Sequence, residues 1–161
     1  MKEHTPTLAA LASPQGGAAA PADDRAAPQG LILLAHGARD PAWATPFEAL
    51  AAHVRAAAPQ AQTRLAFLEL MAPGLPDAAG ELARAGCALV DVVPVFLGMG
   101  GHVRRDVPAQ VEALRAAHPG TVFRLHPALG EAPAVIAALA GAALAASGLA
   151  TSTTDPESRP R

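Results

Sequence analysis

The stretch Leu31-Ile-Leu-Leu-Ala-His36-Gly37 begins as a short, uninterrupted apolar run and ends in a histidine and a glycine. Such a run is typical of a strand buried on both faces, as in a parallel sheet covered by helices. A second run of the same character spans residues 88–95, and a glycine-rich segment that ends in His102 follows it. The chain therefore places a histidine beyond each of two predicted buried strands.

Strand-like and helical segments alternate along the chain around these two runs. The predicted order is strand 31–35, helix 46–58, strand 63–70, helix 75–85, strand 88–95, helix 103–117, strand 121–125 and helix 132–146. This alternation predicts an α/β fold with a parallel sheet, right-handed crossovers and helices on both faces. We expect four strands in the order 2-1-3-4, with strands 1 and 3 as neighbours at the switch point where ligands bind.

Composition limits the classes of protein and partner. The chain has 161 residues, 3% aromatic residues and no tyrosine, so one core built mainly from Leu, Val and Ala is expected. The formal net charge of −2 provides no basic surplus that would point to nucleic acid or an anionic membrane. The single cysteine, Cys87, excludes an intramolecular disulfide and is predicted to be a small buried core residue.

The two ends of the chain differ in composition from its middle. Residues 1–29 are rich in Ala, Pro, Gly and Gln, and residues 147–161 are polar, so both are predicted to be disordered around an α/β domain at 30–146. The apolar stretch near the start, Leu8–Ala12, is shorter than a signal-peptide core, and the longest weakly polar run, Ala134–Ala146, is too short to span a bilayer. We therefore expect a soluble, cytoplasmic protein without membrane or nucleic-acid partners.

The two histidines form the candidate site. Neighbouring strands lie about 4.8 Å apart, so imidazoles that follow strands 1 and 3 could reach one ion or small ligand. Neutral imidazole is a suitable ligand for Co²⁺, Fe²⁺ and Ni²⁺, and histidine also accepts protons near neutral pH. His36 and His102 are therefore predicted to form one site for metal or proton chemistry.

Other residues near the two histidines are candidates with more than one interpretation. Glu69 ends the second predicted strand, where it could be a metal ligand, a proton acceptor or a solvated charge. Glycines before His102 allow a backbone to approach a ligand closely, and arginines can pair bidentately with substrate carboxylates. The arginines could equally be ordinary surface residues. The predicted substrate-binding residues are Gly100, Gly101, Arg39, Arg104 and Arg105.

Three stretches together resemble the sirohydrochlorin chelatase family, the short class II tetrapyrrole chelatases. They are Leu34-Ala-His36-Gly-Ala-Arg39-Asp-Pro41, Phe67-Leu-Glu69, and Val93-Pro-Val-Phe-Leu97-Gly-Met-Gly-Gly-His102-Val-Arg-Arg-Asp106-Val-Pro108. The resemblance spans residues 31–146 and is most specific from Pro94 to Pro108. Ala38 stands where the family often has serine, which removes a hydroxyl but no ligand.

The resemblance implies a flavodoxin-like, chelatase-like fold and a reaction. That reaction is insertion of Co²⁺ or Fe²⁺, with Ni²⁺ a third candidate, into sirohydrochlorin during cobalamin or sirohaem synthesis, without an organic cofactor. It implies that His36 and His102 bind the metal and assist removal of the pyrrole protons, and we add Glu69 to the predicted catalytic set. It also implies a homodimer, for which the Ala-rich helix 132–146 is a candidate contact.

Two alternatives remain open from the sequence. A metal or tetrapyrrole carrier could use the same pair of histidines without catalysis. A flavodoxin-like module for nucleotides or anions would need phosphate-facing glycines and hydroxyls after the first strand, and His36-Gly-Ala-Arg39 supplies few hydroxyls. The anion-binding alternative is therefore the weaker of the two.

Overall fold

A computed structural model describes residues 27–149 of the chain. Most of the arms predicted at 1–29 and 147–161 lies outside these residues. Four parallel strands form one sheet in the order β2-β1-β3-β4, which confirms the predicted topology. The strands are β1 (Gln29–Ala35), β2 (Gln62–Phe67), β3 (Leu89–Pro94) and β4 (Val122–Leu125).

The helices follow the predicted alternation, with two short 3-10 helices added. They are η1 (Pro41–Ala44), α1 (Thr45–Ala57), α2 (Leu75–Arg84), α3 (Val103–Ala117), η2 (Leu129–Glu131) and α4 (Pro133–Ser147). The start of η1 has a clear local cause, because the Asp40 carboxylate accepts a hydrogen bond from the Ala42 N–H at 2.9 Å. Pro41 then occupies a position where no N–H is needed.

The second strand is shorter than predicted. It ends at Phe67 rather than at Leu70, and the residues after it form bends, among them Leu70 with a φ of 62°, outside the extended region. The backbone N–H groups of Leu68 and Glu69 still donate to the carbonyls of Ala35 and His36. Glu69 therefore lies on a turn fixed against the end of β1, and the prediction that it ends a strand is wrong.

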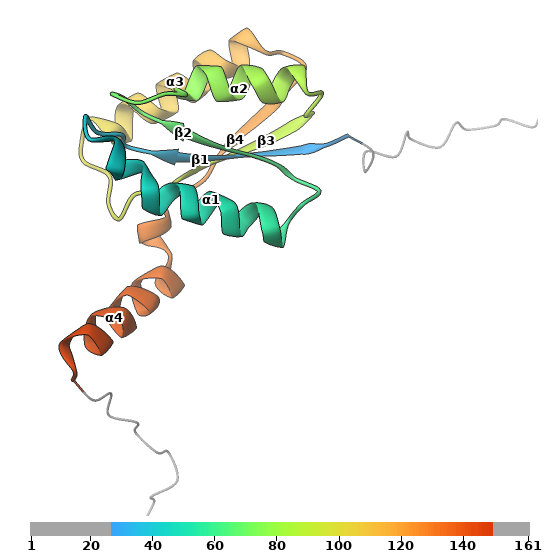
Figure 1. Cartoon of the computed structure of the whole chain (residues 1–161). Coiled ribbons are helices and arrows are strands. Elements are labelled where there is room, and N and C mark those ends of the chain that lie inside the picture. Colours follow the sequence, from blue (N-terminus) through green and yellow to red (C-terminus); the bar gives the residue numbers. More distant parts are fainter. Residues whose placement is uncertain (1–26, 150–161) are drawn as a thin grey trace, which may run out of the picture.

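The main core lies between the sheet and the layer formed by α2 and α3 (Figure 1). Alternate strand residues point into this layer, as the two-residue period of a strand requires. Cys87 is 1% exposed at its edge, and burial raises the pKa of its thiol, so the prediction of a core cysteine is confirmed. The largest buried strand residues here are Ile32, Leu34, Val90, Val92 and Phe123.

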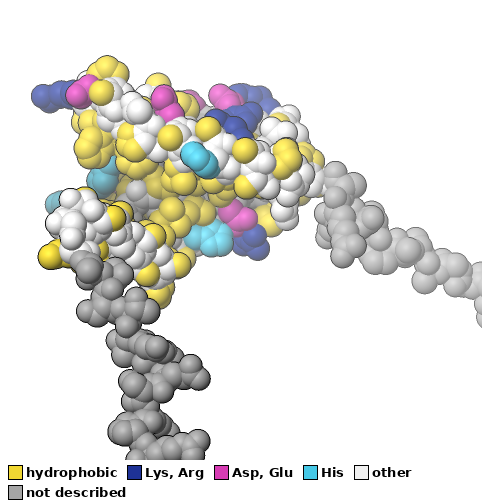
Figure 2. All heavy atoms as spheres, turned by 60° about the horizontal axis from the view of Figure 1, so that its bottom comes forward, with side chains coloured by type: hydrophobic (Ala, Val, Ile, Leu, Met, Phe, Trp, Pro, Cys, Tyr) yellow, Lys and Arg dark blue, Asp and Glu magenta, His cyan; other side chains and the backbone are white. Residues whose placement is uncertain are grey.

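The opposite face of the sheet is only half covered. Helix α1 packs against β2 and shields Ala35 and Phe67, but no described helix covers β3 and β4 on this side. Figure 2 views this side and shows hydrophobic side chains beside histidine, acidic and basic groups. Helix α4 extends away from the sheet in Figure 1 and has no buried residue. Within residues 27–149, no helix has the length and apolar character that a membrane span requires.

Candidate functional site

The two predicted metal-binding histidines lie beyond the carboxyl ends of neighbouring strands. Strand β1 pairs with β3 in parallel, with Leu34 opposite Pro94. His36 follows β1 directly, and His102 is the residue before the first turn of α3. The segments that carry them leave the sheet at the same edge (Figure 1). This is the topological switch point at which parallel α/β sheets bind ligands.

His36 is held, at its ring and at its backbone, by the segments that follow the two neighbouring strands. Its ring centroid lies 4.7 Å from that of Phe96, with the two rings tilted by 39°. Phe96 is 5% exposed, so it forms a fixed wall for the imidazole. On the other side, the His36 carbonyl accepts a hydrogen bond from the Glu69 N–H at 3.0 Å. The half-buried histidine is therefore positioned before any ligand binds.

Gly37 allows the chain to turn immediately after His36. Its φ of +92° lies in the region that favours glycine. A Cβ built at Gly37 would lie 1.9 Å from the Glu69 carbonyl oxygen, so no side chain fits without a backbone shift. The sequence His36-Gly37 thus lets the turn after β2 pack directly against the end of β1.

His102 is exposed, unlike His36. The Arg104 Nε donates to the Met99 carbonyl at 3.0 Å, which closes the glycine-rich segment onto the start of α3. The Arg105 guanidinium lies 3.5 Å from Nδ1 of His102, the outer limit of a hydrogen bond. Of the two predicted substrate-binding arginines here, Arg104 therefore fixes the glycine-rich segment, and Arg105 places a cation beside the imidazole of His102.

The remaining predicted residues are open to solvent. Arg39 and the side chain of Glu69 are exposed, and a Cβ at Gly100 or Gly101 would meet no atom within 4 Å. Across residues 27–149, no three His, Cys, Asp or Glu side chains are grouped so that they could hold a metal ion. An ion at the two histidines would therefore keep positions for water or substrate, unlike one in a closed four-ligand site.

A polar cluster on the open half of the sheet was not predicted from the sequence. Asp91 lies opposite Arg124 in the β3–β4 register and pairs with it through two hydrogen bonds of 2.7 and 2.9 Å. Nε2 of His126 lies 2.7 Å from the same carboxylate. The hydrogen bond from Arg124, more than the neighbouring His126, lowers the pKa of Asp91 below its ordinary value. The signal that could have indicated this cluster is Asp91 itself, an acidic residue inside the otherwise apolar strand β3.

This cluster predicts acid-dependent stability. A lowered folded-state pKa means that Asp91 contributes stability above its unfolded pKa of about 3.9, and that this contribution is lost as the pH falls further. We expect Asp91→Asn to lower the free energy of unfolding by about 1 kcal/mol at pH 7, a modest value because Arg124 is largely exposed. The difference from wild type should shrink below about pH 4 in denaturant titrations.

Arg124→Gln provides the matched partner variant. It should also lower the free energy of unfolding at pH 7, and the double variant should cost less than the sum of the two, as expected for contacting residues. Additive effects, or a difference between wild type and Asp91→Asn that stays constant down to pH 3, would contradict the assignment.

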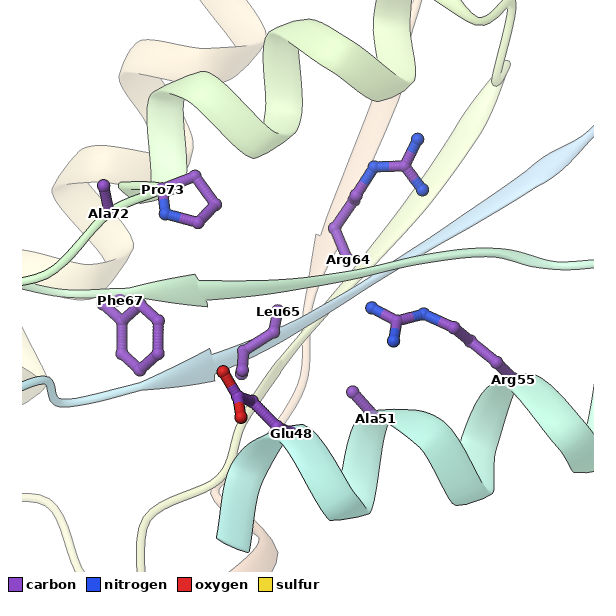
Figure 3. A pocket seen from close by; sticks show the side chains of 8 residues that line it. All are labelled: Glu48, Ala51, Arg55, Arg64, Leu65, Phe67, Ala72 and Pro73. Carbon is purple, nitrogen blue, oxygen red and sulfur yellow. The ribbon is translucent and has the colours of Figure 1, made fainter. Parts of the chain in front are cut away.

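A separate cavity of about 470 Å³ lies between α1 and the edge strand β2 (Figure 3). Its lining contains neither predicted histidine. Arg55 spans it to donate to the Thr63 carbonyl at 3.4 Å, and Arg64 pairs with Glu81 at 2.9 Å, so both guanidinium groups are already engaged within the chain. The lining residues are Glu48, Ala51, Arg55, Arg64, Leu65, Phe67, Ala72 and Pro73.

Comparison with characterised proteins gives a consistent result. Residues 30–145 match the CbiX family model. A sirohydrochlorin cobaltochelatase from Methanopyrus kandleri is 33% identical over 78 residues, which is 48% of this chain and 54% of that protein. One from Methanothermobacter thermautotrophicus is 33% identical over 79 residues, or 49% and 54% of the two chains. The chain spans about half the length of the curated relatives it matches.

Solved structures agree on the fold. A CbiX protein from Marinobacter aquaeolei VT8 is 34% identical with a TM-score of 0.68, over 75% of this chain and 98% of that one. The chelatase SirB from Bacillus subtilis subspecies spizizenii, in complex with cobalt, is 20% identical with a TM-score of 0.64, over 71% and 49% of the two chains. At that identity the second likeness shows the fold alone. Since the family match covers almost the whole described domain, the chain belongs to the CbiX family, as its resemblance to the sirohydrochlorin chelatases predicted.

Proposed function

We propose that this protein inserts a divalent metal ion, Co²⁺ or Fe²⁺, into sirohydrochlorin. The observation that carries the proposal is the placement of His36, held against Phe96, at the same edge of the sheet as the loop that presents His102. The names of the curated relatives favour cobalt as the metal. The description of the Marinobacter aquaeolei protein as one of cobalamin biosynthesis favours that pathway over sirohaem synthesis.

The reaction exchanges ligands and protons without oxidation or reduction. The hydrated ion loses water, four ring nitrogens replace its ligands, and the two pyrrole N–H groups release protons. Two imidazoles hold a borderline ion such as Co²⁺ while leaving positions open for the macrocycle, so the ion stays transferable. After the ion has left, a neutral imidazole accepts a pyrrole proton and passes it to solvent. Glu69, on the turn beside His36, is proposed as a further acceptor for these protons.

Cationic side chains surround this edge and suit a substrate that carries many carboxylates. Arg39 and Arg105 are exposed beside the two histidines, where guanidinium groups can pair with carboxylates. A single lobe leaves much of a planar macrocycle in water, whereas ligand pockets bury most of their ligand. We therefore place the working site in a homodimer, whose second copy supplies the other wall.

An absorbance assay tests the function. Metal-free sirohydrochlorin is mixed with a catalytic amount of protein and with Co²⁺, Fe²⁺ or Ni²⁺ in turn, under anaerobic conditions, and the tetrapyrrole spectrum is followed. We expect metal insertion faster than the spontaneous rate, and fastest with Co²⁺. Rates equal to the protein-free control for all three metals would overturn the proposal.

A further inference from the structure

The cavity between α1 and β2 lies at an open edge of the sheet (Figure 3). β2 is the first strand in the order β2-β1-β3-β4, so one of its sides has no neighbouring strand. The cavity has a volume of about 470 Å³, which is within the range of small-molecule sites. Neither candidate histidine lines it, and the proposed reaction does not use it.

Unused backbone groups of Leu65 lie at this edge. The Leu68 N–H donates to a carbonyl of β1, whereas the Phe67 N–H donates away from β1, to the Pro73 carbonyl at 2.9 Å. Because backbone directions alternate along a strand, the N–H and C=O of Leu65 also point away from β1. Within residues 27–149, no loop or side-chain group bonds them. Leu65 lines the cavity, which therefore has a free backbone donor and acceptor at its wall.

Two arginines in the lining keep free donors. In the described part of the chain, Arg55 uses only its Nε, in a 3.4 Å bond to the Thr63 carbonyl that is close to the outer limit of a hydrogen bond. Arg64 donates to the same carbonyl at 3.2 Å and to Glu81 at 2.9 Å. A guanidinium group has five N–H donors, so both side chains retain N–H groups that suit a carboxylate.

Glu48 places the opposite charge in the same cavity. It precedes Arg55 by two turns of α1, and both side chains rise from the helix toward Leu65 (Figure 3). Long helical side chains lean toward the N-terminus, so the Arg55 guanidinium extends toward Glu48, yet among the described residues no ion pair joins the two. Since Arg64 is paired with Glu81, one positive and one negative charge remain, and the cavity suits a compact zwitterion better than an anion or a cation.

We propose that this cavity binds a free α-amino acid with an apolar side chain. The carboxylate pairs with the free N–H groups of Arg55 and accepts a hydrogen bond from the Leu65 N–H. The ammonium group donates to Glu48 and to the Leu65 carbonyl. The apolar side chain packs against Phe67 and Pro73, which form the apolar part of the wall. The proposal rests on this cavity alone and does not depend on the metal-insertion reaction.

An NMR titration of the isotope-labelled full chain with L-leucine, without metal or tetrapyrrole, tests the site. Binding should saturate at one leucine per chain and should shift the Leu65 amide and the Arg55 Nε–H signals. Isocaproate, which is leucine without its ammonium group, and isoamylamine, which is leucine without its carboxylate, should each bind at least about tenfold more weakly. No saturable binding of leucine, equal affinity for the three compounds, or shifts centred on His36 and His102 would overturn the proposal.

Two variants identify which charge of the ligand each residue contacts. Arg55→Gln should reduce the preference for leucine over isoamylamine and keep the preference over isocaproate, and Glu48→Gln should do the reverse. Each variant keeps one preference, so an unfolded protein is not mistaken for a loss of recognition. Arg84→Gln, an exposed change on α2 outside the cavity, is the matched control and should bind leucine like wild type. Variants at Arg55 and Glu48 that keep both preferences would contradict the proposal.

Discussion

His36→Ala and His102→Ala should each lower the catalysed rate of metal insertion by about 100-fold or more, because each removes a metal ligand and a proton acceptor. The fold should survive both changes. His102 is exposed, and His36 is only half-buried against Phe96. The measurement is the initial rate of sirohydrochlorin metallation, corrected for the spontaneous reaction, beside a thermal melt of each variant.

His53→Ala is the matched control for these variants. His53 is exposed on α1, where its Nδ1 lies 2.8 Å from the Ala49 carbonyl oxygen, so it belongs to the body of that helix and not to the segments that carry the two site histidines. This variant should keep the wild-type rate. Near-normal rates in both His36→Ala and His102→Ala would exclude the two-histidine site even if the protein proved to be a chelatase.

Gly37→Ala should be the most destabilising single substitution next to the site. A non-glycine residue at positive φ costs about 1–3 kcal/mol, and the added Cβ would also clash with the Glu69 carbonyl 1.9 Å away. We expect the free energy of unfolding to fall by at least about 2 kcal/mol in denaturant titrations. Because the turn after β2 must move, the His36 backbone should move with it and metal insertion should slow.

Gly98→Ala separates this effect from a general cost of replacing glycine near the site. A Cβ at Gly98 meets no atom within 4 Å, although Gly98 lies in the segment that leads to His102. It should change the free energy of unfolding by less than about 0.5 kcal/mol. Equal losses in the two variants would mean that the close approach of Gly37 to Glu69 does not determine the local stability.

Local sequence signals were enough to predict the sheet and its order. Uninterrupted apolar runs such as Leu31–Ala35 are typical of buried strands, and the helices between them predict parallel pairing with right-handed crossovers. The turn at Leu70 could not be predicted in the same way, because leucine rarely adopts a φ of 62°. The residues before it are fixed by tertiary hydrogen bonds, since the Leu68 and Glu69 N–H groups donate to the carbonyls of Ala35 and His36. Tertiary contact overrode local preference there.

The sequence predicts which two loops form the site, but it does not predict the side-chain contacts within it. Parallel topology brings His36 and His102 to one edge of the sheet, and that follows from the sequence. The packing of His36 on Phe96 depends on side-chain positions that no spacing rule gives. The pairing of Asp91 with Arg124 depends on the register of β3 and β4, which the sequence alone does not fix. The outward direction of α4 depends on how η2 is anchored, and η2 itself was not predicted.

The central claim is that the protein turns over sirohydrochlorin rather than merely carrying metal or tetrapyrrole. The most direct measurement is the amount of metallated product formed when sirohydrochlorin and Co²⁺ are both in large excess over the protein. We predict many equivalents of product per chain, formed at a rate proportional to protein concentration and reduced to the spontaneous rate in the His36→Ala/His102→Ala double variant. Product that stops at one equivalent per chain, or a rate independent of protein concentration, would contradict catalysis.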